Sequence, residues 1–345
     1  MEPSYFYKKG LCGLRNLGNT CYINSITQCM NNDRTFLEYF LTDRYKEDEN
    51  KKTNMNLLQE FINIVKNLYK ENACVTPQSY LLEIKKIASK DPCYQELIGY
   101  GQADSQEFLQ FFLEKMHTHL QYKVSMTITG KSKNSTDTLA TKAYNTWNTH
   151  FNKGYSKIIE HFYGLEYSNI SSSTDSSYSS DTFSPFSSIA IPIPPNIEQQ
   201  TCSLYDCLDN YTSKETDINH EQHNSDTNNI YDKQLKFWSL PNTLIIFIKR
   251  YDNMLNKKNN LITFPITDLN LLSYSIGYDN DKNIYDLFAI SNHSGRVNGG
   301  HYWCYGKNSD GDWYNFNDEN VSRLNPSEII TPNAYCLFYK RKQLS

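Results

Sequence analysis

Residues 13–25 read GLRNLGNTCYINS, a stretch in which a cysteine opens an amphipathic segment. The apolar residues that follow recur at helical spacing, so the sequence predicts a helix over residues 22–30, capped by Asn19 or Thr20. Cys21 would then lie at the positive end of the helix dipole, which favours the thiolate. The thiolate is the nucleophilic form of cysteine, so this segment predicts a reactive thiol.

A second informative segment lies near the C-terminus, at residues 292–318. It contains NHSG at 292–295, GGHY at 299–302 and WYNFND at 313–318. His301 is the natural base, and the two glycines before it leave room for an extended substrate. A strand, a turn and a returning strand would bring the carboxylate of Asp318 beside the imidazole, where it can fix the tautomer and stabilise the imidazolium.

Asn16 precedes Cys21 by five residues. Its side-chain amide could point at a developing oxyanion, a role worth roughly 3–4 kcal/mol in a comparable hydrolase. Cys21, His301, Asp318 and Asn16 together supply the groups needed for nucleophilic acyl transfer.

The two segments resemble the cysteine box and the histidine box of the ubiquitin-specific proteases, a family of cysteine deubiquitinases. Three blocks between them are also similar to that family, in family order: residues 102–109 (QADSQEFL), 147–164 and 240–251 (LPNTLIIFIKRY). The match runs from about residue 10 to residue 339. One motif alone would be weak, whereas five ordered blocks identify the chain as a member of the family.

The resemblance implies a role for each catalytic residue. Cys21 is the nucleophile, and His301 is the general base and then the acid. Asp318 is the third member of the triad, and Asn317 shares its orienting role. Asn16 stabilises the oxyanion. The implied reaction hydrolyses the isopeptide or peptide bond after the C-terminal glycine of ubiquitin, through a thioester on Cys21.

The resemblance also implies a binding site for the ubiquitin tail. Asp104 matches a carboxylate that pairs with arginines of the tail. Residues 294–300 match a mobile loop that covers the tail. Gly299, Gly300 and Tyr302 would line the narrow channel for its terminal Gly-Gly.

The implied fold is α+β, a papain-like cysteine protease with a helical thumb, a β-sheet palm and a β fingers extension. The family domain would span residues 10–341, with the thumb at 10–122, the fingers at 160–235 and the palm at 236–341. Periodicity predicts further helices at 56–70, 76–88, 104–120 and 204–208, and strands at 244–249, 285–291, 301–306, 313–316 and 335–340. Three polar stretches are expected to be loops: 123–139, the serine-rich and mobile 168–188, and 214–229.

Packing roles compete with functional roles at several positions. We expect five other cysteines to be inert small hydrophobes: Cys29, Cys74, Cys93, Cys304 and Cys336. His293 is the competing histidine, for which we expect a loop-structuring role. Asp104 with Glu107 also forms a capping box for the helix that follows, and one carboxylate can serve both purposes.

The sequence departs from the family at the fingers and at one cleft residue. Many members hold the finger tips with zinc on two Cys-x-x-Cys pairs. Here the first expected pair falls at residues 168–173, without cysteine, and the second offers only His220 and His223. Because a structural zinc site needs four ligands, we expect no metal and no cofactor. Ala103 stands where the family usually has glutamine.

Composition agrees with an intracellular globular enzyme. The formal charge of the 345-residue chain is −4, which gives no reason to expect nucleic acid or a membrane surface as a partner. Nine cysteines lack a disulfide-like spacing, and residues 1–10 lack the apolar region of a signal peptide. The expected partners are ubiquitin and ubiquitinated proteins, and the expected state is a monomer in the cytoplasm or nucleus.

Two other functions stay open at this point. The triad does not choose the substrate, so the chain could process another ubiquitin-like modifier. It could also be a catalytically silent ubiquitin-binding module, although such a module has no need of all four catalytic residues.

Overall fold

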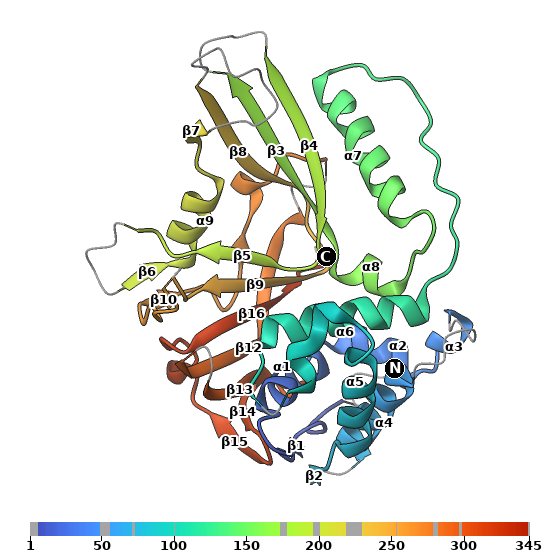
Figure 1. Ribbon diagram of the computed structural model, residues 1–345, viewed down its shortest axis with the longest axis vertical. Helices are drawn as coiled ribbons and strands as arrows, with labels where there is room; N and C mark the ends of the chain where they lie inside the picture. Colours follow the sequence, from blue (N-terminus) through green and yellow to red (C-terminus); the bar gives the residue numbers. More distant parts are fainter. Residues whose placement is uncertain are drawn as a thin grey trace.

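The computed structural model describes residues 6–48, 56–70, 73–99, 101–172, 178–195, 201–218, 230–252, 254–278, 282–296 and 299–343. Most of the described helices lie in the N-terminal third of the chain and most of the strands in the remainder. Figure 1 shows the N-terminal helices packed against the C-terminal strands in the lower half of the molecule. Within the described part of the chain, no helix has the length and apolarity to cross a membrane.

The N-terminal helices form the thumb around a central helix, α1. Every residue of α1 is buried, so this helix lies inside the lobe. Helix α6 packs beside it through Phe108, Phe112 and other apolar side chains of the same core. The elements of this lobe are β1 (Gly13–Leu14), α1 (Cys21–Asn31), α2 (Arg34–Leu41), α3 (Tyr45–Asp48), α4 (Leu57–Lys70), β2 (Cys74–Val75), α5 (Gln78–Ala88), the 3₁₀ helix η2 (Pro92–Ile98) and α6 (Ser105–Leu120).

The palm is a mixed sheet with the strand order β15-β14-β13-β12-β16-β9-β5. Its long central hairpin, β12–β13, is antiparallel and pairs Ser294 with His301. The palm elements are β5 (Ile189–Pro192), β9 (Thr243–Lys249), β11 (Leu269–Asn270), η3 (Leu272–Tyr274), β12 (Ile284–Arg296), β13 (Gly299–Lys307), β14 (Trp313–Asn317), β15 (Asn320–Leu324), η5 (Pro326–Glu328) and β16 (Ala334–Arg341).

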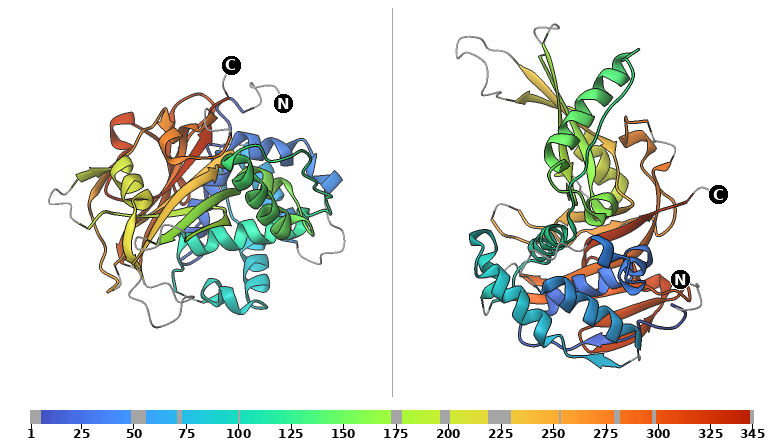
Figure 2. Two further views of the ribbon diagram at one scale, coloured as in Figure 1. Left: turned by 90° about the horizontal axis from the view of Figure 1, so that it is seen from above. Right: turned by 90° about the vertical axis from the view of Figure 1, so that its right-hand side faces the viewer.

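The fingers form a separate sheet with the order β4-β3-β8-β7, which projects away from the thumb and palm (Figure 2). Helix α7 packs along β4, where Ala143, Leu165 and Phe183 form a small core of their own. The elements of this region are α7 (Ser135–Phe151), α8 (Lys157–Phe162), β3 (Gly164–Ser172), β4 (Ser179–Phe186), β6 (Thr201–Ser203), α9 (Leu204–Thr212), β7 (Glu215–Ile218), β8 (Tyr231–Ser239) and β10 (Leu261–Thr263), which pairs with β6.

Strand β9 lies between two hydrophobic cores. Ile245 and Phe247 belong to the core that holds the thumb helices. Leu244, Ile246 and Ile248 belong to a second core, which also contains residues of α9. Because both faces of the strand are buried, its sequence is a continuous apolar run instead of an alternating one.

A buried polar cluster joins the thumb to the palm. Asp33 accepts hydrogen bonds from Thr243 Oγ1 at 2.5 Å and from Lys340 Nζ at 3.1 Å, and its Oδ2 lies 2.8 Å from His161 Nε2. Burial by itself raises the pKa of Asp33, but the charges of His161 and Lys340 outweigh burial and lower it. The carboxylate therefore links α2, α8, β9 and β16 as an ion.

Periodicity located the thumb helices and the palm strands. The predicted helices at 22–30, 56–70, 76–88 and 104–120 are confirmed as α1, α4, α5 and α6, and 204–208 begins α9. The five predicted palm strands are confirmed as β9, β12, β13, β14 and β16.

All three predicted loops are wrong in part. The described residues of 168–188 form most of β3 and β4, since Tyr167 and Phe183 pair across the hairpin and pack at a ring distance of 5.4 Å beside α7. The stretch 123–139 ends inside α7, which Asn134 caps by accepting from Asp137 N at 2.8 Å. In 214–229, β7 covers Glu215–Ile218, while 219–229 lie outside the described residues.

Candidate active site

Cys21 is the first residue of α1 and is 3% exposed. Thr20 precedes the helix, but its hydroxyl accepts from Leu17 N at 2.9 Å and makes no cap. The prediction of a side-chain cap by Thr20 is therefore wrong. Cys21 nevertheless lies at the N-terminal end of the helix, where the helix dipole favours a negative charge.

His301 on β13 lies beside Cys21 and hydrogen-bonds with it. Its Nε2 is 2.6 Å from Asn317 Oδ1, so Nε2 carries the proton and Nδ1 is the ring nitrogen left for sulfur. The hydrogen bond with Cys21 is the largest cause that raises the pKa of His301 to about 9; burial opposes it, and Asn317 adds to it. The histidine is therefore suited to an imidazolium paired with a thiolate.

The turn between β14 and β15 separates the two residues predicted to support His301. Asn317 ends β14 and contacts the imidazole, whereas Asp318 is the first residue of the turn, with φ of +51°. The carboxylate of Asp318 accepts from Asn24 Nδ2 at 2.8 Å and from Asn16 Nδ2 at 3.0 Å. Asn317, and not Asp318, thus occupies the position expected for the third member of the triad.

Asn16 is held in place from both ends of its amide. Its Oδ1 accepts from Gly18 N at 3.0 Å and from Thr20 N at 3.2 Å, while Nδ2 donates to Asp318. An amide NH₂ group carries two N–H bonds, so Asn16 can donate to Asp318 and to a substrate oxygen at once. Asp318 is placed to orient the predicted oxyanion donor.

A glycine allows this arrangement of distant segments. Leu14 N donates to Asp318 O at 2.9 Å, so β1 docks on the β14–β15 turn. A Cβ on Gly13 would lie 2.3 Å from Glu319 O. Only glycine permits that approach, which brings Asn16 to Asp318 across 302 residues.

Asp104 caps α6 and also contacts the palm. It accepts from Gln106 N at 2.7 Å and from Tyr335 Oη at 2.7 Å, and burial raises its pKa. Glu107, one turn further on, hydrogen-bonds with Glu96. Burial first, and then the charge of Glu96, raise the pKa of Glu107 to about 7. Asp104 thus caps the helix, but Glu107 pairs with Glu96 instead of completing the expected capping box.

The predicted channel residues differ in what they face. Gly299 is exposed, and a Cβ built on it meets no atom within 4 Å. A Cβ on Gly300 would lie 2.3 Å from Ser294 O and 2.5 Å from His293 Nε2. The side chain of Tyr302 is 4% exposed, with its ring 4.3 Å from that of His293. Both glycines are exposed, but only Gly299 has open space at its Cβ position, and Tyr302 supports the site from inside the core.

The predicted covering loop, 294–300, is partly strand. Ser294 to Arg296 continue β12 and Gly299 begins β13, while 297–298 lie outside the described residues. His293 underlies this hairpin with 1% exposure, and Tyr251 Oη lies 3.0 Å from its Nδ1. Burial and the charge of Lys257 lower the pKa of His293 to about 4. Its position agrees with the structural role predicted for it.

Two residues near the thiol received no role from the sequence. Gln102 Nε2 donates to Cys21 Sγ at 2.9 Å, and Gly300 N donates to Gln102 Oε1 at 2.6 Å. Asn24 holds Asp318 and also donates to Leu14 O at 3.1 Å. Both residues lie inside family-like blocks, and this position was the only indication of a role in the sequence. A sequence block does not show the direction of a side chain.

The fingers do not fit the zinc site found in many members of the family. Residues 168–172 lie in β3 and offer hydroxyl and amide groups instead of thiolates. His220 and His223 lie outside the described residues, within which no group of three or more His, Cys, Asp and Glu side chains is arranged to hold a metal. We therefore assign no chemistry to zinc in this chain.

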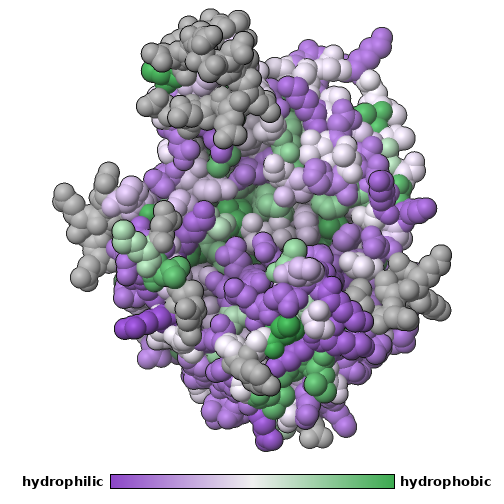
Figure 3. Space-filling model, in the orientation of Figure 1, coloured by the Kyte–Doolittle hydropathy of each residue, from purple (hydrophilic) through white to green (hydrophobic). Residues whose placement is uncertain are grey.

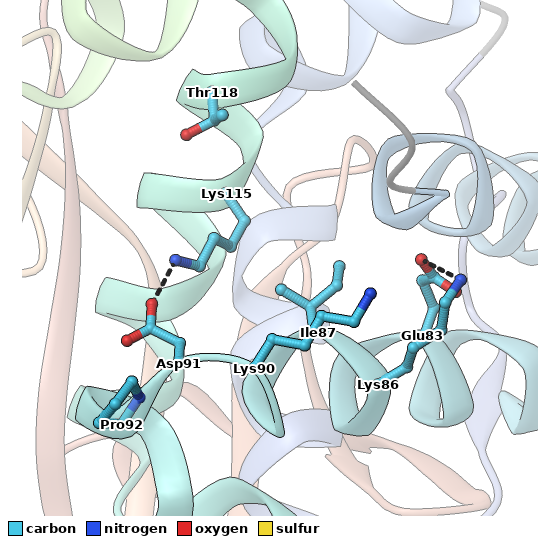
Figure 4. A pocket seen from close by; sticks show the side chains of 8 residues that line it. All are labelled: Glu83, Lys86, Ile87, Lys90, Asp91, Pro92, Lys115 and Thr118. Carbon is cyan, nitrogen blue, oxygen red and sulfur yellow. Dashed lines mark hydrogen bonds and ion pairs between the residues drawn. The ribbon is translucent and has the colours of Figure 1, made fainter. Parts of the chain in front are cut away.

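A pocket of about 270 Å³ on the thumb is a separate feature (Figure 4). It lies between α5 and α6, and four of its five charged side chains form ion pairs: Lys86 with Glu83 at 2.9 Å and Lys115 with Asp91 at 2.7 Å. It shares no lining residue with the cluster around Cys21. The pairs satisfy each other, so we do not place catalytic chemistry there.

Comparison with known sequences agrees with this geometry. The family model for ubiquitin carboxyl-terminal hydrolase matches residues 12–339. Human ubiquitin carboxyl-terminal hydrolase 2 is 30% identical over 348 residues, which cover 96% of this chain and 55% of the human protein. Ubiquitin carboxyl-terminal hydrolase 8 of Saccharomyces cerevisiae is 28% identical over 372 residues, 100% of this chain and 74% of the yeast protein. The chain thus spans about half the length of the human relative.

Solved structures share the fold. The SAGA Ubp8/Sgf11/Sus1/Sgf73 DUB module bound to ubiquitin aldehyde matches with a TM-score of 0.75 and 28% identity, over 100% of this chain and 72% of that chain. The structure of the Ubp8-Sgf11-Sgf73-Sus1 SAGA DUB module gives a TM-score of 0.71 at 26% identity, over 98% of this chain and 69% of that one. The fold is therefore the α+β, papain-like arrangement of thumb, palm and fingers. From the family match over most of its length, the chain belongs to the ubiquitin carboxyl-terminal hydrolase family.

Proposed function

We propose that this chain is a thiol-dependent deubiquitinase that hydrolyses the isopeptide or peptide bond after the C-terminal glycine of ubiquitin. The observation that carries the proposal is the line of contacts from Cys21 through His301 to Asn317, with Asn16 fixed next to it. The solved relative bound to ubiquitin aldehyde supports ubiquitin as the modifier.

The reaction follows from these contacts. The Cys21 thiolate attacks the carbonyl carbon of the terminal glycine, an S–C bond forms, and the carbonyl electrons move to oxygen. Asn16 is placed to donate to that oxyanion. The oxyanion collapses, the C–N bond breaks, and the His301 imidazolium gives its proton to the leaving amine.

Water completes the cycle. Neutral His301 takes a proton from water, whose oxygen attacks the thioester carbon. The C–S bond then breaks, which releases the ubiquitin carboxylic acid and restores the thiolate and imidazolium, and the acid gives its proton to the solvent. Asn317 keeps Nε2 protonated throughout, so Nδ1 always faces the reacting atoms.

Recognition of the tail is assigned to the acidic group on α6. The ubiquitin tail is cationic just before its terminal glycines, and Asp104 and Glu107 offer carboxyl groups at the start of α6, shortly after Gln102, which contacts Cys21 Sγ. Asp104→Asn keeps most of the helix-capping ability but removes the charge. It should therefore raise KM for a ubiquitin substrate almost as much as Asp104→Ala. A fully active Asp104→Asn with an impaired Asp104→Ala would make Asp104 a capping residue only.

A covalent probe tests the proposed function directly. Ubiquitin with a C-terminal electrophile should label the wild-type chain and not Cys21→Ala, while Cys21→Ala still binds ubiquitin. The same probe built on other ubiquitin-like modifiers should label weakly. Preferential labelling by another modifier would reassign the substrate, and binding of ubiquitin without labelling would identify a silent binding module.

We also propose that the chain acts as a monomer in a reducing compartment of the cytoplasm or nucleus, without nucleic acid or membrane as a partner. The nine cysteines are all unpaired, as expected where thiols stay reduced. Light scattering across a concentration series would test the monomer, since a dimer would double the measured mass.

A further inference from the structure

Gln102 bridges the nucleophile and the strand that carries the base. It lies two residues before Asp104, the N-cap of α6, and its side chain reaches into the site. Its Nε2 is 2.9 Å from Cys21 Sγ, and its Oε1 is 2.6 Å from Gly300 N. One carboxamide thus joins α1 to β13 directly at the reacting sulfur.

The orientation of this carboxamide is fixed by chemistry. A backbone N–H can only donate, so the oxygen of Gln102 must face Gly300. The NH₂ group then faces Cys21 and requires the sulfur to accept. His301 also hydrogen-bonds with the same sulfur. When His301 is an imidazolium, its Nδ1–H is a second donor to this sulfur, and a thiolate can accept from both groups at once.

The same donor is within reach of the charge that forms during the reaction. Once sulfur bonds to the carbonyl carbon, the oxyanion is only two bonds away from sulfur. An N–H group that already contacts sulfur can turn to that oxygen with little movement and reach the separation of roughly 2.7–3.1 Å that such donors use. Gly300 N keeps hold of the other end of the amide while this happens.

We propose that Gln102 is a catalytic residue that donates to the Cys21 thiolate in the resting enzyme and then to the oxyanion beside Asn16. This inference rests on the proposed function for the second half of its role. Its first half concerns only the thiol and does not depend on the substrate. Glutamine is needed because the position requires an acceptor toward Gly300 and a donor toward sulfur on one planar group.

Another role for Gln102 makes the opposite prediction. The amide lies between Cys21 and Gly300, so it could instead be a plug that ubiquitin must displace from the channel. Removing a plug would tighten ubiquitin binding and raise kcat/KM. Removing an oxyanion donor lowers kcat and weakens a transition-state analogue more than it weakens the ground-state ligand.

Two variants separate the parts of the amide. Gln102→Leu removes both hydrogen bonds with similar volume. Gln102→Glu keeps the acceptor for Gly300 but puts a carboxylate against the sulfur. The matched control is Gln95→Leu, because Gln95 is exposed and its amide donates to Asp91 O. Melting temperatures should show that all three proteins are folded.

The measurements use ubiquitin bearing a fluorogenic C-terminal amide, free ubiquitin, and ubiquitin aldehyde, whose adduct carries the tetrahedral oxygen. Gln102→Leu should lower kcat by about 100-fold. Its affinity for ubiquitin aldehyde should fall by at least about tenfold, while its affinity for free ubiquitin changes by less than about twofold. Gln102→Glu should lose more activity than Gln102→Leu, and Gln95→Leu should match the wild type.

Alkylation of the free enzyme by iodoacetamide tests the thiolate contact without any substrate. The pH midpoint of Cys21 alkylation should move upward in Gln102→Leu and further upward in Gln102→Glu. If wild type ignores every ubiquitin reagent but this shift appears, the proposed function fails and the thiolate contact stands. Unchanged kcat, aldehyde affinity and alkylation in both variants would overturn the inference. Tighter ubiquitin binding with a higher kcat/KM in Gln102→Leu would overturn it in favour of the plug.

Discussion

Neighbouring side chains in one turn support different parts of the site. Asn317 faces the imidazole of His301, while Asp318 faces the amides of Asn16 and Asn24. In a serine protease a single aspartate orients and charges the histidine. Here a neutral amide orients the histidine, and the carboxylate is placed to order the oxyanion donor.

The two residues should therefore fail in different ways. In Asp318→Asn, an NH₂ group replaces one of the two carboxylate oxygens that accept from Asn16 and Asn24. Two donors then face each other and Asn16 is displaced, so kcat should fall by about 100-fold or more. Asn317→Ala removes a bond that raises the pKa of His301. Its kcat/KM should fall by about tenfold, and the alkaline limb of its pH profile should move to lower pH.

Steady-state kinetics across pH would separate these outcomes. The control is Asp312→Asn, since Asp312, just before β14, pairs with the exposed Arg323 of β15. If Asp318→Asn is as active as the wild type and Asn317→Ala is nearly dead, Asn16 does not depend on Asp318.

Glu107 should make substrate binding sensitive to pH. Its pKa of about 7 means that the carboxyl is neutral below that pH and charged above it. A cationic tail would lose this partner on acidification, so KM should rise as the pH falls from about 8 to about 6. Glu107→Gln should have a high KM that no longer changes in that range. Glu328→Gln, an exposed change elsewhere, should keep the wild-type profile.

The sequence located the nucleophile and the base but not all of their neighbours. Cys21 and His301 lie in motifs whose chemistry is readable from residue type. Gln102 is 81 residues from the thiol that it contacts, and Asn24 is 294 residues from Asp318. The direction of each amide depends on how α6 and the β14–β15 turn dock on α1. The spacing of residues along the sequence does not determine that docking.

At the scale of elements, two adjacent glycines of the β12–β13 hairpin provide a test of the predicted channel. Gly299→Ala meets no atom within 4 Å, so the melting temperature should stay the same while KM for a ubiquitin substrate rises severalfold. Gly300→Ala places a methyl group 2.3 Å from Ser294 O and should lower both the melting temperature and kcat. Thermal unfolding and kinetics of the two variants would show this contrast. A normal KM for Gly299→Ala would remove Gly299 from the channel.

Helices and strands were predicted correctly where apolar residues recur at regular spacing. The prediction failed where pairing with neighbouring strands determines the structure. Helices α4 and α6 have clear apolar faces and were found. Strands β3 and β4 are rich in serine and were taken for a loop, because their stability comes from neighbouring strands and from α7. No window of sequence contains those neighbours, so tertiary packing overrode composition there.

At the scale of the whole molecule, Asp33 should control resistance to acid. Its folded-state pKa is lowered, so its contribution to the free energy of unfolding is present above the unfolded value of about 4 and is lost as pH falls further. Asp33→Asn should lower the free energy of unfolding by about 3–5 kcal/mol at neutral pH, because His161 and Lys340 lose their buried partner.

Urea unfolding at neutral and acidic pH would measure this effect. The wild type should lose stability on acidification, and the gap to Asp33→Asn should narrow. Asp43→Asn is the control, since Asp43 pairs with Lys46 at the surface and should change stability by less than about 1 kcal/mol. Equal stability of Asp33→Asn and the wild type at neutral pH would contradict the role of the cluster.

The position of β9 between two cores has a consequence for how the molecule opens. Neither core can come apart without exposing one face of this strand, so thumb and palm should unfold as one cooperative unit. The β3–β4 hairpin and α7 instead share only a small core and should open on their own. In native-state hydrogen exchange, amides of β9 should exchange at the rate of global unfolding and those of β4 much sooner. The catalytic groups would then stay assembled while this outer part of the fingers opens and closes.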